Sequence, residues 1–574
     1  MTQAMGRPFR SEPPRVKKKI PMSPMSVAGL EENTMHAPMK TSRTDWWLGS
    51  LFLLGVCGYL ALLMTVGRFP FVDEIYYKAA GREWAVSGHF RSPECAGFIE
   101  VALEYAGYSA AESKAAAADH ANVSVDEIFA TYPPLYPFLF GLFVKMFGFS
   151  WRTSLLYDGL LHVWLCCITI WGARRIAPEG ARWRAYLAGL AVLPLGTVGR
   201  PDELAMCFGM AACGLALAPM LTWPRCMISG ALLGLCCGTS MGAALGFACV
   251  WAGLRVPILF SAQWRGALAA TALAALSGIC ALAACLLPIA ITHPHAYTFF
   301  IGEVQRTAAA LPLVATWLVA ARLQGLFFAE LIGAMLSAVL LALVLRGQSR
   351  TDGLRILLGA VFCPFLMVYL VRGKYPYLWF TLPWLLAGVM SVAGAARFGA
   401  GLWARRIATA IVLVGIPLGA IPYVHSIAIL LKLPREQSLS YNVEHLRSII
   451  PPGAVAMGDV AWLALLGRNL VYDPVFSSPR NIERVDYVLV TSNGTGLPAV
   501  RRPLTSDQEE YLSRHFRVLE SRFATTPLVL LGRRLSHNAY GFGTIVYVRQ
   551  DQPFTRAALS TGGCAKGKFL SVIP

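Results

Sequence analysis

The chain contains a succession of apolar runs, each about as long as the hydrocarbon core of a membrane is thick. A helix needs roughly 20 mostly apolar residues to cross a bilayer, and the first such run extends from Trp46 to Val66. With 574 residues, 56% hydrophobic content and 14% charged content, the chain is too apolar for a soluble protein and too long for one span. These features predict a polytopic α-helical membrane protein.

The charges between the runs predict about eleven spans, with the N-terminus inside and the C-terminus outside. The expected spans are 46–66, 152–173, 184–198 and 204–220, two short helices within 226–251, and then 266–289, 326–345, 354–371, 377–396 and 407–431. Basic clusters such as Arg174-Arg175 and Arg405-Arg406 lie between runs and are expected to face the cytoplasm. Topology therefore explains the net charge of +18, which does not indicate a nucleic-acid partner.

Three regions are expected along the chain. Residues 1–45 are predicted to be a disordered basic cytoplasmic tail without a cleavable signal. Residues 46–433 form the transmembrane domain, in which an outside loop at 67–150 contains juxtamembrane helices. Residues 434–574 are expected to form a soluble α/β domain outside, because hydropathy falls and a helix at 506–515 lies among short strands. Those strands are expected at 454–457, 469–472, 485–491, 517–521 and 544–549.

Two acidic pairs are expected on the outside face of the membrane domain. Asp73-Glu74 follows the first span, and Asp202-Glu203 follows Pro201 at the start of the fourth. A charge costs roughly 2.5–3.5 kcal/mol at the centre of a spanning helix, so carboxylates are tolerated at the interface or in a wet cavity. Both pairs also suit the first turn of a helix, where acids favour the helix dipole. Capping and chemistry both remain open for them.

Other polar residues are predicted on the same outside face. The loop after the seventh span contains His293, His295 and Arg306, and the turn between spans nine and ten contains Arg372 and Lys374. His293 and His295 flank a proline, which is a weak metal-binding pattern and is equally consistent with interfacial loop residues. Cys95 and Cys564 also fall outside, where they could form a disulfide, whereas most other cysteines lie within apolar runs.

The order of these motifs resembles a known family. The first span ends in Asp73-Glu74, a Tyr-Pro-Pro-Leu-Tyr run follows Thr131, and Arg200-Pro-Asp202 precedes the fourth span. Over roughly residues 46–431 the chain resembles the C-superfamily (GT-C) membrane glycosyltransferases, in the branch of protein O-mannosyltransferases and lipid A aminoarabinose transferases. Relatives often place a lysine in the break between the two short helices, where this chain has Thr239-Ser-Met241.

The resemblance implies a sugar donor linked to a polyprenyl phosphate. Asp73 matches the acidic residue that acts as the base on the acceptor, and Asp202 matches a second acidic position that binds either the acceptor or a divalent cation such as Mg²⁺ or Mn²⁺. Glu74, Arg200 and Glu203 would then shape the acceptor site. The donor phosphate would meet Arg306, Arg372, Lys374 and Tyr375. Chemistry agrees, because displacement of a lipid phosphate from an anomeric carbon needs a base near the attacking hydroxyl and positive charge near the leaving group.

We therefore expect an inverting glycosyltransferase in a bacterial cytoplasmic membrane, with a lipid, a glycan or a protein as acceptor. The sequence does not identify the donor sugar or the acceptor. An alternative is a lipid-linked glycan transporter, which would place ionisable residues within the spans and show internal symmetry. The acids are expected at span ends and the two halves do not match, which favours the enzyme. A second alternative, a membrane anchor that displays the terminal domain, would not need these charges.

Overall fold

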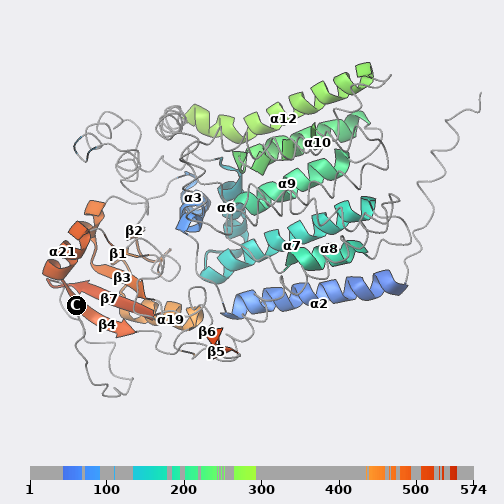
Figure 1. Cartoon of the computed structure of the whole chain (residues 1–574). Helices are drawn as coiled ribbons and strands as arrows, with labels where there is room; N and C mark the ends of the chain where they lie inside the picture. Colours follow the sequence, from blue (N-terminus) through green and yellow to red (C-terminus); the bar gives the residue numbers. More distant parts are fainter. Residues whose placement is uncertain are drawn as a thin grey trace, which may run out of the picture.

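The computed structural model has a helical bundle with an α/β unit at one end (Figure 1). It describes residues 43–66, 72–90, 109, 111, 133–176, 184–193, 201–216, 222–241, 243–244, 247–248, 251–252, 264–292, 435, 438–458, 465, 467–472, 479–492, 504, 506–522, 529–530, 533–534 and 543–551. The four expected spans between 326 and 431 lie outside the described residues, as do Cys95 and Cys564.

Six helices of the bundle pack side by side (Figure 1). They are α2 (Arg43–Val66), α7 (Trp151–Ile176), α8 (Arg184–Val192), α9 (Pro201–Ala216), α10 (Trp223–Cys237) and α12 (Trp264–Thr292). Among the described residues, three segments are long and apolar enough to cross a membrane: Asp45–Thr65, Trp151–Gly172 and Trp264–Ile291. They coincide with the expected spans 46–66, 152–173 and 266–289. The described part of α8 ends at Val192 and that of α9 at Ala216, and the remainders of the predicted spans, 194–198 and 217–220, lie outside the described residues. The helix α10 lies at the first of the two short helices expected within 226–251.

Two further helices, α3 (Val72–Ser87) and α6 (Leu135–Phe147), pack together at the end of the bundle where α2 ends and α7 begins (Figure 1). Glycines set their distance. A Cβ atom on Gly81 would lie 2.4 Å from the carbonyl oxygen of Pro137, and one on Gly141 would lie 2.5 Å from the carbonyl oxygen of Gly81. Real Cβ atoms essentially never come that close. The contact of α3 with α6 is therefore a backbone contact that only glycine permits.

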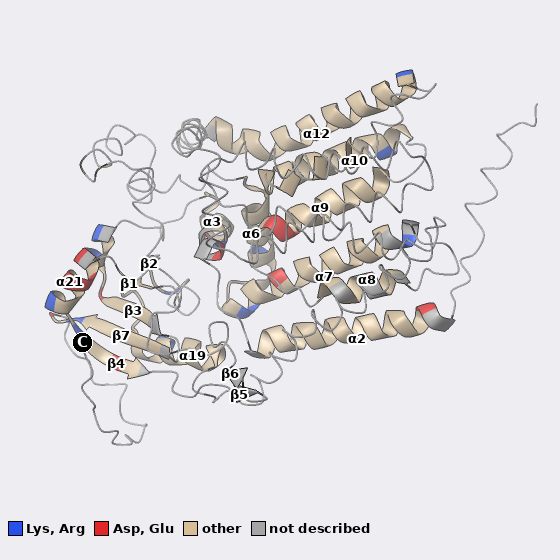
Figure 2. Ribbon diagram, viewed as in Figure 1, with Lys and Arg blue, Asp and Glu red and all other residues tan. Residues whose placement is uncertain are grey.

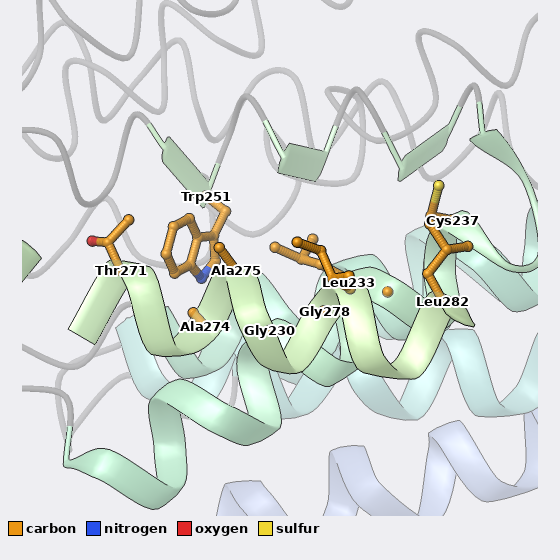
Figure 3. Close-up of a pocket in the computed structure, with 11 residues that line it drawn as sticks. Gly230, Leu233, Cys237, Trp251, Thr271, Ala274, Ala275, Gly278 and Leu282 are labelled. Atoms are coloured by element: carbon orange, nitrogen blue, oxygen red, sulfur yellow. The ribbon is translucent and has the colours of Figure 1, made fainter. Parts of the chain in front are cut away.

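The helices α10 and α12 leave a shallow groove of about 310 Å³ between them. Figure 3 shows Trp251 beside Thr271 at one end and Cys237 beside Leu282 at the other. Small residues, including Gly230, line the floor. The lining contains no ionisable group other than a thiol, so this groove lacks the groups that acid–base chemistry needs.

The C-terminal unit contains a mixed five-stranded sheet in the order β2-β1-β3-β7-β4. The strands are β1 (Ala456–Met457), β2 (Val471–Tyr472), β3 (Tyr487–Ser492), β4 (Phe516–Arg522) and β7 (Gly543–Arg549). The strand β1 pairs in parallel with β2 and β3, whereas β7 is antiparallel to β3 and β4. Each strand falls in a segment where the sequence predicts one, and α21 (Ser506–His515) lies at the predicted helix. The helix α19 (Leu439–Ile449), the 3₁₀ helix η8 (Pro479–Arg484) and the hairpin of β5 (Val529–Leu530) and β6 (Arg533–Arg534) were not predicted.

The sheet packs against the same end of the bundle that carries α3. One buried apolar cluster contains Ala79 from α3, Trp151 and Leu155 from α7, and Leu439 from α19. Sheet residues, among them Val548, belong to the same cluster. The α/β unit therefore shares a core with the start of α7 and with α3.

Candidate active site

Helix α3 begins with the first acidic pair. Val72 is its first helical residue, so Asp73 and Glu74 lie in its first turn, where the helix dipole favours carboxylates. The placement of the Asp73 side chain lies outside the described part of the chain. The Glu74 side chain is described and is 1% exposed. The backbone thus places Asp73 at the start of α3, beside a buried acid.

Glu74 belongs to a buried network centred on Lys78, one turn later on α3. The Nζ atom of Lys78 donates to Glu74 Oε1 at 2.5 Å, to Asp158 Oδ2 at 2.6 Å and to Ser154 Oγ at 2.8 Å. The hydroxyl of Tyr136 donates to the other oxygen of Asp158, Oδ1, at 3.2 Å. Because these residues come from α3, α6 and α7, the network joins three helices.

Burial makes this network energetically important. Glu74, Lys78 and Asp158 are each at most 1% exposed, and the Phe140 ring centroid lies 5.5 Å from the Lys78 ammonium. Removal of one partner from a buried ion pair costs about 3–5 kcal/mol, because a charge is left uncompensated. The first turn of α3 is therefore strongly tied to α7.

The second acidic pair begins helix α9 and is also buried. Asp202 and Glu203 lie in its first turn and are 6% and 3% exposed. Ser240, in the polar break after α10, donates its hydroxyl to Asp202 Oδ1 at 2.8 Å. His162 on α7 lies with Nδ1 3.1 Å from Glu203 Oε1 and with Nε2 2.9 Å from the carbonyl oxygen of Leu193. Both acids are thus held to neighbouring elements.

The proton on this histidine follows from its two partners. A carbonyl oxygen only accepts, so Nε2 of His162 carries a proton and donates to Leu193. The hydrogen bond between Nδ1 of His162 and Glu203 Oε1 also needs one proton, which is carried either by the imidazole or by the carboxyl group. The other carboxyl oxygen, Glu203 Oε2, is buried without a hydrogen-bond partner within the described ranges.

The polar break connects the two acidic pairs through α6. The amide of Leu135, the first residue of α6, donates to the carbonyl oxygen of Gly238 at 3.3 Å. Within the break, Ser240 donates a hydrogen bond to Asp202. On α6, Tyr136 follows Leu135 and donates a hydrogen bond to Asp158. Figure 2 shows acidic residues at the α6 end of α9 and within α7. One end of the bundle therefore collects the described acids of α3, α7 and α9.

The structure gathers part of the predicted site. It brings Glu74, Asp202 and Glu203 to the same end of the bundle, together with the start of α3 where Asp73 lies. The remaining predicted residues are outside the described ranges: Arg200, His293, His295, Arg306, Arg372, Lys374 and Tyr375.

One sequence expectation is wrong. The acids were expected at span ends alone, but Asp158 and His162 are buried within Trp151–Gly172, the second apolar segment. Neither residue belongs to the site predicted from the sequence, and neither do Lys78 and Ser154. A signal was available, since an ionisable residue inside an apolar run is costly unless it has a partner. Asp158 meets that cost because Lys78 lies within hydrogen-bonding distance.

Of the residues considered for a divalent cation, Asp202 lies within the described residues, whereas His293 and His295 lie outside them. In the part of the chain that the structure describes, no three His, Cys, Asp or Glu side chains are grouped so as to hold a metal ion. Asp202, the acid considered for this role, accepts a hydrogen bond from Ser240.

Comparison with known proteins gives structural matches alone. No family model matches the chain, and no curated protein matches it by sequence. ArnT from Cupriavidus metallidurans bound to undecaprenyl phosphate matches with a TM-score of 0.43 and 15% identity, over 88% of this chain and 98% of that one. Its apo state gives a TM-score of 0.43 and 14% identity over the same shares. An Archaeoglobus fulgidus oligosaccharyltransferase in complex with Zn and sulfate matches with a TM-score of 0.40 and 14% identity, over 76% of this chain and 67% of that one.

Proposed function

We propose that this protein is an integral membrane glycosyltransferase of the C superfamily. It transfers one sugar from a polyprenyl-phosphate donor to an acceptor hydroxyl at the outer face of a bacterial cytoplasmic membrane. The observation that carries the proposal is the convergence of two acidic helix starts, those of α3 and α9, at one end of an apolar bundle. Buried polar side chains support both starts, and a helix cap alone does not need such support.

The reaction is a single displacement with inversion. Asp73 acts as general base and takes the proton of the acceptor hydroxyl, while the hydroxyl oxygen forms a bond to the anomeric carbon. The bond from that carbon to the phosphate oxygen breaks, and the polyprenyl phosphate leaves with the electron pair. General-base assistance contributes about 10²- to 10⁴-fold in rate. Cations near the departing phosphate stabilise its charge in a site with little water.

The other residues divide between the two substrates. Arg200, Asp202 and Glu203 shape the acceptor side, with Asp202 held by Ser240 and Glu203 held by His162. Glu74 is bonded to Lys78, so it supports the start of α3. The donor phosphate is bound by Arg306, Arg372, Lys374 and Tyr375.

The charge distribution supports the proposed orientation. Arg174 lies in the last turns of α7, and Arg225 and Arg265 lie in the first turns of α10 and α12. Figure 2 shows basic residues at these helix ends, which lie away from α3 and from the α/β unit. Basic residues favour the cytoplasmic side. The acids and the α/β unit are then outside.

A transporter of lipid-linked sugars is the second candidate, because Asp158 and His162 are buried within an apolar segment. Ionisable residues at such positions serve ion coupling in transporters. In this chain the Lys78 ammonium compensates the charge of Asp158, and His162 is paired with Glu203. Structural pairing accounts for both, which favours the enzyme.

The test supplies purified full-length protein in lipid nanodiscs with a panel of radiolabelled polyprenyl-phosphate sugars and with lipid, glycan and peptide acceptors. We expect transfer from at least one donor and a loss of about 10²- to 10⁴-fold in Asp73→Asn. The matched control is Glu83→Gln, which removes a carboxylate from the other end of α3 and should retain wild-type rates. Full transfer by Asp73→Asn would eliminate that residue as the base. If no transfer occurs in nanodiscs, the same protein is reconstituted into sealed vesicles, where movement of labelled donor across the membrane would favour the transporter.

A further inference from the structure

The side chain of Lys78 is fully buried, at 0% exposure, and all of its donor capacity is used. An ammonium group has three protons. Three acceptors lie within 2.8 Å of Nζ: Glu74 Oε1, Asp158 Oδ2 and Ser154 Oγ. No proton remains for a phosphate, so Lys78 does not fit the role of a donor-binding cation.

The positions of these acceptors give Lys78 a different role. Glu74 is one turn before Lys78 on α3, whereas Ser154 and Asp158 are one turn apart on α7. The ammonium therefore links the first turn of α3 to one face of α7. Asp73 immediately precedes Glu74, so the backbone that bears the proposed base is fixed by the same link.

We propose that Lys78 is a positioning residue that holds the first turn of α3, and with it Asp73, in the geometry that sugar transfer requires. This proposal rests on the proposed function. A displacement of about 1 Å at a reacting group can cost about 10²-fold in rate. Loss of the ammonium would leave two buried carboxylates facing each other without a countercharge, and α3 would move to separate or hydrate them.

The first test compares Lys78→Met with wild type in the transfer assay. Met keeps the length and the apolar stem of the side chain and removes the charge. We expect kcat to fall about 10²-fold, while KM for the donor and for the acceptor stays within about twofold. The matched control is Lys145→Met, which removes an exposed lysine of α6 that packs 4.2 Å from the Trp84 ring centroid on α3. That control should retain wild-type kcat.

A second variant separates positioning from a general loss of stability. The triple change Glu74→Gln, Lys78→Met and Asp158→Asn removes all three buried charges together. Replacement of a complete buried ion network is far less costly than removal of one partner. We therefore expect the thermal midpoint to recover toward wild type while kcat stays low. Recovery of kcat together with the midpoint would show a merely structural lysine and would overturn the proposal.

Hydrogen–deuterium exchange of the full-length protein provides a readout that does not depend on sugar transfer. We expect amides of Val72–Ser87 to exchange at least about tenfold faster in Lys78→Met, with Trp264–Thr292 unchanged as an internal reference. Unchanged exchange in α3 would overturn the proposal, even if the proposed reaction proves wrong. A raised KM for the donor at constant kcat would also overturn it, because that result would assign Lys78 to phosphate binding.

Discussion

The contact of α3 with α6 makes a quantitative prediction for Gly141→Ala. The new methyl group would lie 2.5 Å from the carbonyl oxygen of Gly81 and 2.7 Å from the ring of Trp84, whereas ordinary contacts begin near 3.4 Å. The two helices would have to separate by about 1 Å to relieve this overlap, a change that costs about 1–3 kcal/mol in well-packed cores. Because α3 carries Asp73, the same shift is expected to lower the rate of sugar transfer by about 10²-fold.

Two measurements on purified protein test this reasoning, the thermal midpoint and the transfer rate. Gly58→Ala is the matched control, since Gly58 lies within helix α2 and a Cβ atom there would meet nothing within 4 Å. That control should be neutral or slightly stabilising, because alanine favours a helix over glycine by about 0.5–1 kcal/mol. A Gly141→Ala protein with the wild-type midpoint and rate would refute the argument. An equal loss of stability and rate in Gly58→Ala would show that the effect does not arise from the contact between α3 and α6.

Two further substitutions test the buried pairs. Glu203→Gln should keep the thermal midpoint within a few degrees, because the glutamine amide can donate to Nδ1 of His162. Glu203→Leu leaves that nitrogen unpaired and should lower the free energy of unfolding by about 1–3 kcal/mol. Equal losses in the two variants would contradict this pairing. Arg468→Ala should destabilise the α/β unit by about 1.5–3 kcal/mol, because its guanidinium donates to two carbonyl oxygens at the end of α19. Limited proteolysis in denaturant measures that loss, and Arg514→Ala, which removes an exposed pair with Glu510, should stay within about 0.5 kcal/mol of wild type.

The sequence predicts the features that local patterns determine. The helices at Arg43–Val66, Trp151–Ile176 and Trp264–Thr292 follow from uninterrupted apolar length, and the strands follow from short alternating runs bounded by turn residues. Helix α3 follows from its amphipathic pattern behind an acidic pair. The start of α9 follows from Pro201 with acids behind it.

What sequence reasoning misses depends on partners that are distant along the chain. Lys78 and Asp158 are 80 residues apart, and their pairing requires the register of α3 against α7 to within one turn. The same holds for His162 and Glu203, which are 41 residues apart. The apolar run around Asp158 and His162 indicates that each needs a partner, but it does not identify which residue that partner is.

The apolar cluster at the boundary of the bundle and the sheet has a consequence for biogenesis. It joins Leu155 to Val548, so a surface made early in translation is covered by residues made near the end. At about 5–20 residues per second, the ribosome needs roughly 20–80 s to synthesise the intervening chain. During that interval Trp151 and Leu155 lack their cover from α19 and β7. The end of the bundle that carries α3 is thus covered late in synthesis, and nascent chains truncated before Leu439 should expose it to quality-control proteases.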